Sequence, residues 1–332
     1  MISSKQAESI IKSFAGKRIL VVGDLMLDRY VTGAVNRISP EAPVPVVLVT
    51  GERALPGGAA NVALNIQSLG GQAIVAGVVG ADRAADDLLA ALTAKKILTD
   101  GVLAYDSVQT TVKTRVMADR QQIVRVDRED LLEPSSAILR DLCKRIAGLA
   151  GGVDGVIIED YGKGAISQGV VDTVMASSKD AKLPIGFDPK ENEKLTMSGI
   201  TLATPNYKEA CAAAGLKESV IRREPESDPV LRSAGEILMR NWDPDLLIVT
   251  LGAHGMYLVT EGREPQIIPT KAREVFDVSG AGDTVIATAF LCLVGGASHY
   301  DAASVANYAA GVVVGKLGTA TCTPGELIEY IG

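Results

Sequence analysis

The chain has 332 residues, of which 47% are hydrophobic and 22% charged, and its formal net charge is −7. This composition is typical of a globular protein, and an acidic chain without a basic tract argues against nucleic-acid binding. Four scattered cysteines and only two histidines argue against a Cys-x-x-Cys pair, a histidine metal cluster and Ser-His-Asp chemistry. We expect the cysteines to be buried free thiols.

The first segment predicts an amphipathic helix rather than a secretory leader. Residues 1–15 carry Lys5, Glu8 and Lys12 among apolar residues, and they lack both the apolar core and the cleavage site of a signal peptide. No apolar run reaches the length needed to span a membrane. The sequence therefore predicts a cytoplasmic protein with no membrane partner.

Apolar runs and amphipathic stretches alternate along most of the chain. The predicted strands span residues 18–24, 44–49, 73–80, 155–160, 183–188, 201–204 and 246–252, with hairpins at 110–127 and 256–270. The predicted helices span residues 57–69, 82–97, 134–150, 167–179, 206–214, 231–240, 282–294 and 301–316. Such alternation predicts an α/β fold in which a mostly parallel sheet carries helices on both faces.

Two segments depart from this alternation. Residues 29–50 contain three prolines, which favour an edge strand or a flap over a central strand. Residues 110–127 alternate apolar and polar side chains, as in an exposed antiparallel hairpin that is half buried on one face. We expect the two segments to form a small β-sheet lid, inserted in a single domain that spans residues 1–332.

Five apolar strands end in polar or glycine-rich groups. These groups are Gly23-Asp24 and residues 159–164, 188–190, 205–209 and 250–255. Ligands of open α/β sheets bind beyond the carboxyl ends of the strands, so we expect the five groups along one rim. Ordinary turns also use Asp and Gly, but five such ends together favour a binding rim. We expect Asp28 one helical turn beyond Asp24.

The most informative segment is Asp277-Val278-Ser279-Gly280-Ala281-Gly282-Asp283-Thr284, which opens an apolar helix. Backbone N–H groups at a helix N-terminus hold anionic oxygens. A carboxylate in the same turn disfavours a bound phosphate unless it takes part in the chemistry. The role that fits Asp283 is a general base that takes a proton from a hydroxyl attacking a phosphoryl group. The segment predicts a small-molecule kinase.

A second glycine turn, residues 57–61, opens another predicted helix. It is either a closely packed helix start or a ligand contact in which Asn61 bonds substrate hydroxyls and the glycines admit close backbone approach. It has neither the Gly-Lys-Ser/Thr of a Walker loop nor a Gly-x-Gly-x-x-Gly fingerprint. Classical P-loop and Rossmann interpretations are therefore rejected.

Three motifs together resemble the ribokinase/PfkB-like carbohydrate kinase family over essentially the whole chain. They are the paired glycines at 57–58, the Asn-x-x-Glu of Asn206 and Glu209, and the Asp-x-x-Gly-Ala-Gly-Asp that ends at Asp283. Three further segments, residues 23–30, 37–46 and 311–319, are similar to the D-glycero-β-D-manno-heptose 7-phosphate kinases of that family. Those enzymes make heptose 1,7-bisphosphate for the lipopolysaccharide inner core.

The resemblance implies an ATP-dependent kinase with Mg²⁺. Asp283 would deprotonate the sugar C1 hydroxyl, and the amides of Gly280, Ala281 and Gly282 would hold the transferring phosphoryl group. Asn206 and Glu209 would organise Mg²⁺, mostly through water. The family often binds a monovalent cation such as K⁺ nearby, for which Asp277 and the Ser279 carbonyl are the candidates.

The remaining roles that the resemblance implies divide between the nucleotide and the sugar. The residues that would line the ATP site are Thr250, Gly252 and Gly255, with Asn307 near the adenine. The residues that would bind the sugar are Asp24, Gly57, Gly58 and Asn61, with the rim carboxylates Asp160 and Asp188. The cations that would hold the 7-phosphate are Arg115, Lys163 and Lys190, with Arg37 reaching in from the lid, although each is alternatively a solvated or structural charge.

Because the chain ends at Gly332 without a second nucleotide-binding unit, it resembles the stand-alone kinase rather than the form fused to an adenylyltransferase. The alternatives are another sugar or nucleoside kinase of the same fold, and a non-catalytic regulator that binds sugar phosphate. Intact Asp283, Asn206 and Glu209 argue against the regulator. Open strand edges invite pairing, so we expect a homodimer that joins lid to lid.

Overall fold

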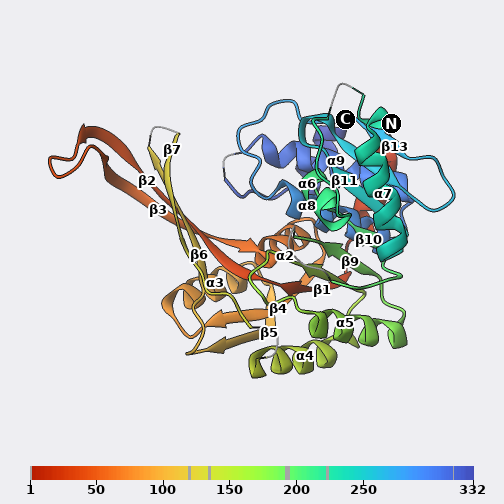
Figure 1. The fold of residues 1–332 in the computed structure, drawn as a ribbon, viewed down its shortest axis with the longest axis horizontal. Coiled ribbons are helices and arrows are strands. Elements are labelled where there is room, and N and C mark those ends of the chain that lie inside the picture. Colours follow the sequence, from red (N-terminus) through yellow and green to blue (C-terminus); the bar gives the residue numbers. More distant parts are fainter. Residues whose placement is uncertain (1, 119–120, 134–135, 191–194, 222–223, 317) are drawn as a thin grey trace.

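The computed structural model describes residues 2–332 except 119–120, 134–135, 191–194, 222–223 and 317. A large sheet flanked by helices forms the body, and a smaller sheet projects from one side of it (Figure 1). The start of the helix predicted at residue 134 and the tip of the hairpin predicted at 110–127 lie outside the described residues. None of the described helices is long and apolar enough to cross a membrane.

The large sheet has nine strands in the order β13-β12-β11-β10-β9-β8-β1-β4-β5. Its strands are β1 (Arg18–Gly23), β4 (Gln72–Gly80), β5 (Leu98–Tyr105), β8 (Gly155–Glu159), β9 (Ile185–Asp188), β10 (Leu202–Ala203), β11 (Leu246–Thr250), β12 (Met256–Val259) and β13 (Gln266–Ile268). The run from β11 to β5 is parallel, and β12 and β13 complete one edge as an antiparallel pair.

Helices cover both faces of this sheet because the central strands are apolar on both sides. In β1, Ile19 and Val21 point into one core, and Leu20 and Val22 point into the other. The first core packs against α1 (Ser4–Lys12), α2 (Ala59–Ser68), α3 (Arg83–Ala94), α8 (Ala281–Val294), α9 (His299–Val314) and α10 (Pro324–Ile331). The second packs against α4 (Ala137–Ala150), α5 (Gln168–Ala181), α6 (Tyr207–Ala213) and α7 (Pro229–Trp242).

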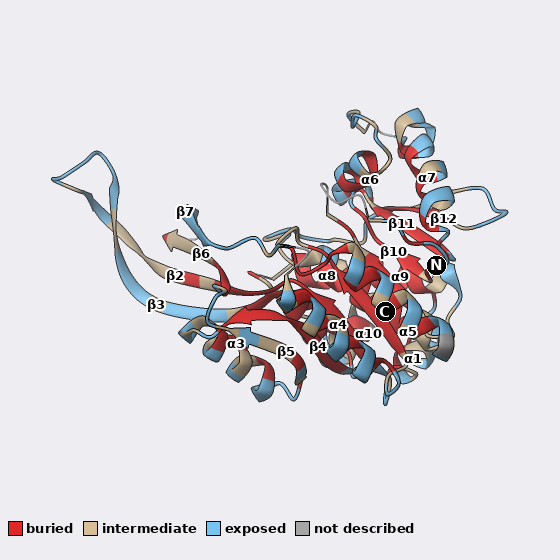
Figure 2. Ribbon diagram, turned by 60° about the horizontal axis from the view of Figure 1, so that its bottom comes forward, coloured by how far each residue is buried: buried red, intermediate tan, exposed pale blue. Residues whose placement is uncertain are grey.

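The projecting sheet, which we call the lid, has the strand order β3-β2-β6-β7. Its strands are β2 (Leu25–Ile38), β3 (Pro45–Gly58), β6 (Thr111–Ala118) and β7 (Gln121–Arg128). Strands β2 and β6 are parallel, whereas the two outer pairings are antiparallel. Burial falls from the base of β2 and β3 to their tips (Figure 2). That the whole chain is a single domain stays a prediction.

The structure corrects several local predictions. Asp28 lies in β2 opposite Leu55, not one helical turn beyond Asp24, because the chain continues as a lid strand. The glycines at 57–58 end β3, and the helix begins only at Ala59. Strand β7 is exposed along its whole length, because the lid projects beyond the helices. The prediction that the hairpin is half buried on one face is therefore wrong for β7.

Two elements were not predicted from the sequence. Strand β5 contains Asp100-Gly101, which favours a turn, yet it pairs with β4, where a Cβ on Gly101 would lie 2.5 Å from the Val75 carbonyl oxygen. Helix α10 follows Thr323, which forms a capping box with Glu326. The Thr-x-x-Glu signal was therefore present in the sequence. The four cysteines are free thiols, as predicted, and all of them except the half-buried Cys143 are also buried as predicted.

Candidate active site

The five strand ends predicted to share a rim follow β1, β8, β9, β10 and β11. These strands are consecutive neighbours in the sheet and are parallel to one another. Their carboxyl ends therefore meet at one edge, where ligands of open α/β sheets bind.

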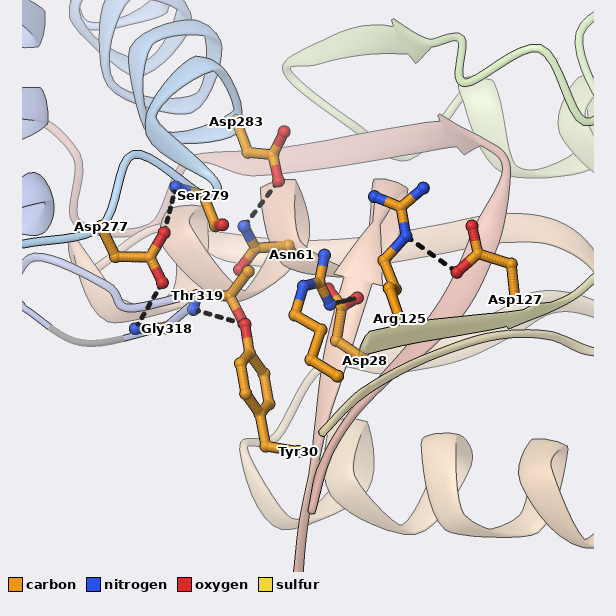
Figure 3. A network of polar contacts seen from close by, with 11 residues as sticks. Asp28, Tyr30, Asn61, Arg125, Asp127, Asp277, Ser279, Asp283, Gly318 and Thr319 are labelled. Atoms are coloured by element: carbon orange, nitrogen blue, oxygen red, sulfur yellow. Dashed lines mark hydrogen bonds and ion pairs between the residues drawn. The ribbon is translucent and has the colours of Figure 1, made fainter. Parts of the chain in front are cut away.

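Asp283 lies in the first turn of α8, above this rim, and its side chain is held at both oxygens. Oδ2 accepts a hydrogen bond from Asn61 Nδ2 at 2.6 Å (Figure 3), and Oδ1 accepts one from the Tyr161 hydroxyl at 2.7 Å. The residue is only 4% exposed. Burial raises the pKa of Asp283, whereas the two hydrogen bonds oppose that rise by favouring the carboxylate. The group is thus oriented and kept available as a proton acceptor.

The turn before Asp283 requires glycine. Gly280 adopts a left-handed conformation with φ of 76°, and a Cβ there would lie 2.7 Å from Asn61 Nδ2. Among the described residues, no side chain caps the N-terminus of α8. The Ala281 amide donates to the Val278 carbonyl at 3.2 Å, so the first-turn amides that follow it are the ones suited to an anionic ligand beside the Asp283 carboxylate.

Asp283 belongs to a cluster of three carboxyl groups. Oxygens of Glu159, Asp188 and Asp283 all lie within 4.8 Å of one another, and neither oxygen of the fully buried Glu159 meets a hydrogen-bond donor among the described residues. Burial, followed by the charges of Asp188 and Asp283, raises the pKa of Glu159 well above its usual range. Burial and the Glu209 charge do the same for Asp188. The cluster cannot carry three full charges without a proton or a cation to offset them.

Two cations lie at the base of the lid. Arg115 on β6 forms a partly buried ion pair with Asp28 on β2, and its guanidinium lies 5.4 Å from the centre of the Tyr30 ring. Lys113, two residues before Arg115, lies 5.2 Å from the centre of the Tyr161 ring. Burial lowers the pKa of Lys113, and the charge of Asp28 opposes this. The base of the lid therefore supplies positive charge to the rim.

Asp24 fixes the loop that carries Tyr161. Its carboxylate accepts hydrogen bonds from the amides of Tyr161 at 2.8 Å, Lys163 at 3.1 Å and Ala165 at 3.0 Å. Asp160 accepts one from the amide of Gly162 at 2.7 Å. Asp24 and Asp160, both predicted to bind sugar, therefore hold backbone in this structure. Whether they also contact a sugar stays a prediction.

The Asn-x-x-Glu motif forms a capping box at the start of α6. Asn206 Oδ1 accepts from the Glu209 amide, and Glu209 Oε2 accepts from the Asn206 amide, each at 2.9 Å. The other Glu209 oxygen pairs with Lys190 at 3.0 Å. Lys163, by contrast, pairs with Glu129 at 2.8 Å. Of the predicted phosphate-binding lysines, Lys190 is thus tied to the metal-binding candidate Glu209.

A cavity of about 470 Å³ opens behind the α8 turn. Its lining includes Thr250, Gly252, Gly255 and Asn307, four of the residues predicted to bind ATP, together with Ala281 and Gly282 of the predicted phosphate turn. The other two predicted ATP residues, Asn206 and Glu209, do not line this cavity. Apolar side chains such as Met256, Val285 and Val314 form the rest of the wall. The structure therefore brings these predicted nucleotide residues together around one cavity of a size and polarity that suit a purine nucleotide.

A second cavity of about 400 Å³ lies between the lid and the segment before α8. Its cations are Arg53 and Arg115, and its neutral donors include Tyr30, Gln122 and Ser279. Residues 275–282 form the wall between the two cavities, since Val275 and Val278 line the first and Phe276 and Ser279 line the second.

Asp277 holds this wall in place. Its carboxylate accepts from the amides of Ser279 at 2.9 Å and Gly318 at 3.1 Å (Figure 3). The K⁺ site predicted at Asp277 and Ser279 stays a prediction.

The glycines at 57–58 lie close to Asp28 and Asp24. A Cβ on Gly57 would lie 2.6 Å from Asp28 Oδ2, and one on Gly58 would lie 2.5 Å from the Asp24 carbonyl oxygen, so the backbone needs glycine at both positions.

Arg37 is the predicted site residue that the structure does not bring to the rim. It is exposed and pairs with Val46 near the tip of the lid, 12 residues beyond Leu25 at the base. Twelve residues of strand span roughly 40 Å. Sequence spacing alone did not show how far the lid projects.

Four residues at the site had no role predicted from the sequence: Asp28, Arg53, Lys113 and Tyr161. The sequence contained a signal for two of them. Lys113 shares a strand face with Arg115, and Tyr161 lies in residues 159–164, one of the five groups predicted to form the rim. Arg53 depends on the register of β3 and could not have been found from the pattern.

Comparison with known proteins identifies relatives among the carbohydrate kinases. Residues 17–326 match the pfkB family carbohydrate kinases. The bifunctional protein HldE of Pelobacter propionicus is 41% identical over 327 residues, which is 98% of this chain and 66% of that protein. HldE of Geobacter sulfurreducens is 42% identical over 328 residues, with 99% and 66% covered. The chain thus spans just under two thirds of the length of these curated relatives.

Two solved structures share the fold. The ribokinase of Arabidopsis thaliana, complexed with ribose and ATP, superposes with a TM-score of 0.73 at 19% identity, covering 95% of this chain and 99% of that one. Phosphofructokinase-2 of Escherichia coli superposes with a TM-score of 0.74 at 18% identity, covering 95% and 98%. The predicted α/β fold and the predicted phosphotransferase class are confirmed, and the chain belongs to the pfkB family of carbohydrate kinases.

Proposed function

We propose that this kinase transfers the γ-phosphoryl group of ATP to the C1 hydroxyl of D-glycero-β-D-manno-heptose 7-phosphate, giving the 1,7-bisphosphate for ADP-heptose and lipopolysaccharide core biosynthesis. The observation that carries the proposal is the position of Asp283. It lies at an uncapped helix start, beside the wall that separates an apolar cavity from one lined by arginines. A cytoplasmic location belongs to the same proposal.

In this proposal Asp283 takes the proton of the acceptor hydroxyl as that oxygen attacks the γ-phosphorus in line. The amides of Gly280, Ala281 and Gly282 hold the phosphoryl oxygens, whose charge is greatest during transfer. Asn61 keeps the carboxylate turned toward the acceptor through its 2.6 Å hydrogen bond. The lid excludes water, which would otherwise accept the phosphoryl group.

The nucleotide and its metal fit the residues present. The cavity of about 470 Å³ has the apolar walls of a purine site, and the related ribokinase fold is known with ATP. Glu209 supplies a carboxylate and Asn206 an amide, donors that suit Mg²⁺ held partly through water. When bound, Mg²⁺ would neutralise charge on the phosphate oxygens. A monovalent cation at Asp277 and Ser279 remains part of the proposal.

We place the 7-phosphate of the substrate in the second cavity. Arg115 is partly buried and paired with Asp28 there, while Arg53 is exposed and lines the cavity from β3. Guanidinium groups bind phosphate by paired hydrogen bonds. A sugar phosphate whose C1 reaches Asp283 would then lie across the rim, below Lys113, with its far end against the lid.

Arg53→Ala is therefore expected to raise KM for the sugar phosphate about 10- to 100-fold, the loss expected for hydrogen bonds to a charged group. The KM for ATP should hardly change, because Arg53 does not line the nucleotide cavity. Steady-state kinetics with either substrate varied measures both constants. Arg37→Ala, which removes the same side chain at the lid tip, is the matched control. Equal effects of the two variants would refute the placement.

A panel of acceptors tests the substrate class. Purified protein with MgATP should phosphorylate heptose 7-phosphate, with much lower kcat/KM for unphosphorylated hexoses and for nucleosides. Efficient turnover of an unphosphorylated sugar alone would favour the alternative of another sugar or nucleoside kinase. Binding of heptose 7-phosphate without any turnover would favour the non-catalytic regulator.

We also propose a homodimer that joins lid to lid. The lid strands expose Ile38, Leu48, Val124 and Val126, each at least 48% exposed, on a sheet whose outer strands β3 and β7 have open edges. Light scattering at micromolar concentration should therefore give twice the mass of one chain. Leu48→Glu should yield monomers, and a monomeric unmodified protein would contradict the proposal.

A further inference from the structure

Tyr161 connects three parts of the site. Its hydroxyl donates to Asp283 Oδ1 at 2.7 Å, and its backbone amide donates to Asp24 at 2.8 Å. Two cations lie near its ring, Lys113 Nζ at 5.2 Å and Lys190 Nζ at 5.6 Å from the ring centre. Such ammonium–ring contacts are attractive and restrict the ring. The phenol is therefore fixed at its backbone, at its ring and at its hydroxyl.

We propose that Tyr161 is a positioning residue for the phosphoryl-transfer reaction, whose hydroxyl keeps the Asp283 carboxylate ionised and turned toward the acceptor. Asn61 holds Oδ2, so the Tyr161 bond to Oδ1 removes the remaining rotational freedom of the carboxylate. The inference deepens the proposed function and rests on Asp283 as its base.

The charges around Asp283 show why a donor is needed there. The acidic neighbours, Asp28 from β2, Glu159 from β8 and Asp188 from β9, disfavour a further negative charge on Asp283. Lys113 from β6 is the cation that favours that charge. Burial also raises the pKa of Asp283, and the Tyr161 bond opposes this. Burial and the Asp283 charge raise the pKa of Tyr161 well above its usual range. The hydroxyl therefore remains a donor throughout the working pH range.

The test is the pH dependence of kcat/KM in the full-length chain, with MgATP and the acceptor that the panel identifies. Tyr161→Phe removes the hydroxyl and nothing else, so the acid limb of the profile should move up by about one pH unit or more. At the alkaline plateau, where Asp283 is ionised without help, kcat should stay within about tenfold of the unmodified enzyme. A uniform loss at every pH with an unmoved acid limb would show a purely structural role and overturn the proposal.

Tyr105→Phe is the matched control. Tyr105 also donates to a carboxylate, Asp141 at 3.0 Å, but both residues line a surface groove. This variant should leave the profile unmoved. Site-specific 3,5-difluorotyrosine at position 161 provides a second measurement that preserves the shape of the side chain. The fluorinated phenol is a stronger donor, so the acid limb should move down, and an unmoved or raised limb would count against the proposal.

Failure of this inference and failure of the proposed function are distinguishable. If Asp283→Asn is nearly inactive while the Tyr161 variants leave the acid limb in place, the base stands and the role of Tyr161 is refuted. If Asp283→Asn keeps near-normal kcat, the role of Asp283 as base and the role of Tyr161 are both refuted.

Discussion

Asp283→Asn is expected to lower kcat by roughly two to four orders of magnitude, the range expected when a general base is lost. The amide keeps the size of the side chain and can still accept from Asn61, but it cannot take the acceptor proton. The KM for both substrates should change little, because the phosphate turn and the two cavities remain. Initial rates with saturating MgATP and sugar phosphate measure the effect.

The stability of this variant separates chemistry from folding. The pKa of Asp283 is raised on folding, so its ionisation opposes folding increasingly as pH rises above the usual range of a free aspartate. Asparagine does not ionise, so the melting temperature at neutral pH should not fall. Asp141→Asn, on the surface groove, is the control and should retain full activity. A kcat within a few-fold of normal for Asp283→Asn would remove this residue from the chemistry.

Gly280→Ala is expected to lower kcat by about two to three orders of magnitude, comparable to the loss of an oxyanion-binding donor. Two effects combine here. The backbone at Gly280 has φ of 76°, which costs an alanine about 1 kcal/mol, and the new Cβ would meet Asn61 Nδ2 at 2.7 Å. To relieve the contact, either Asn61 releases Asp283 or the turn moves its amides.

Gly262→Ala is the matched control, because it reproduces the left-handed backbone without the contact to a neighbouring side chain. Gly262 lies between β12 and β13, has φ of 68°, and would place its Cβ with no heavy atom within 4 Å. Both variants should lose a similar amount of stability from the left-handed backbone, measured by thermal unfolding. Only Gly280→Ala should lose kcat. Similar kinetics for the two variants would show that the turn before Asp283 does not position the reacting groups.

The rim and the place of Asp283 at a helix start could be predicted from the sequence because both depend on short-range patterns. An apolar strand followed by Asp or Gly marks a strand end wherever it occurs, and parallel strands bring such ends to one edge. The Gly-Ala-Gly-Asp turn carries its own chemistry at a helix start. Thr250, Gly252 and Asn307, which were predicted to bind the nucleotide, likewise lie around one cavity.

The lid side of the site could not be predicted in the same way. Its cations depend on the register between strands far apart in the sequence: β2 pairs with β6 so that Asp28 stands opposite Lys113, and Arg115 reaches the same carboxylate. The same register carries Arg37 away toward the tip. Arg53 enters the cavity only because β3 returns antiparallel to β2. Long-range pairing, rather than composition, decides which arginines line the second cavity.

The most direct test of the account is the product formed from heptose 7-phosphate, followed by ³¹P NMR with MgATP and stoichiometric enzyme. We expect one new phosphate signal coupled to C1 of the sugar for each ADP released, and the same signal should appear roughly two to four orders of magnitude more slowly with Asp283→Asn. Phosphorylation at another hydroxyl, or ADP release without a sugar bisphosphate, would contradict it.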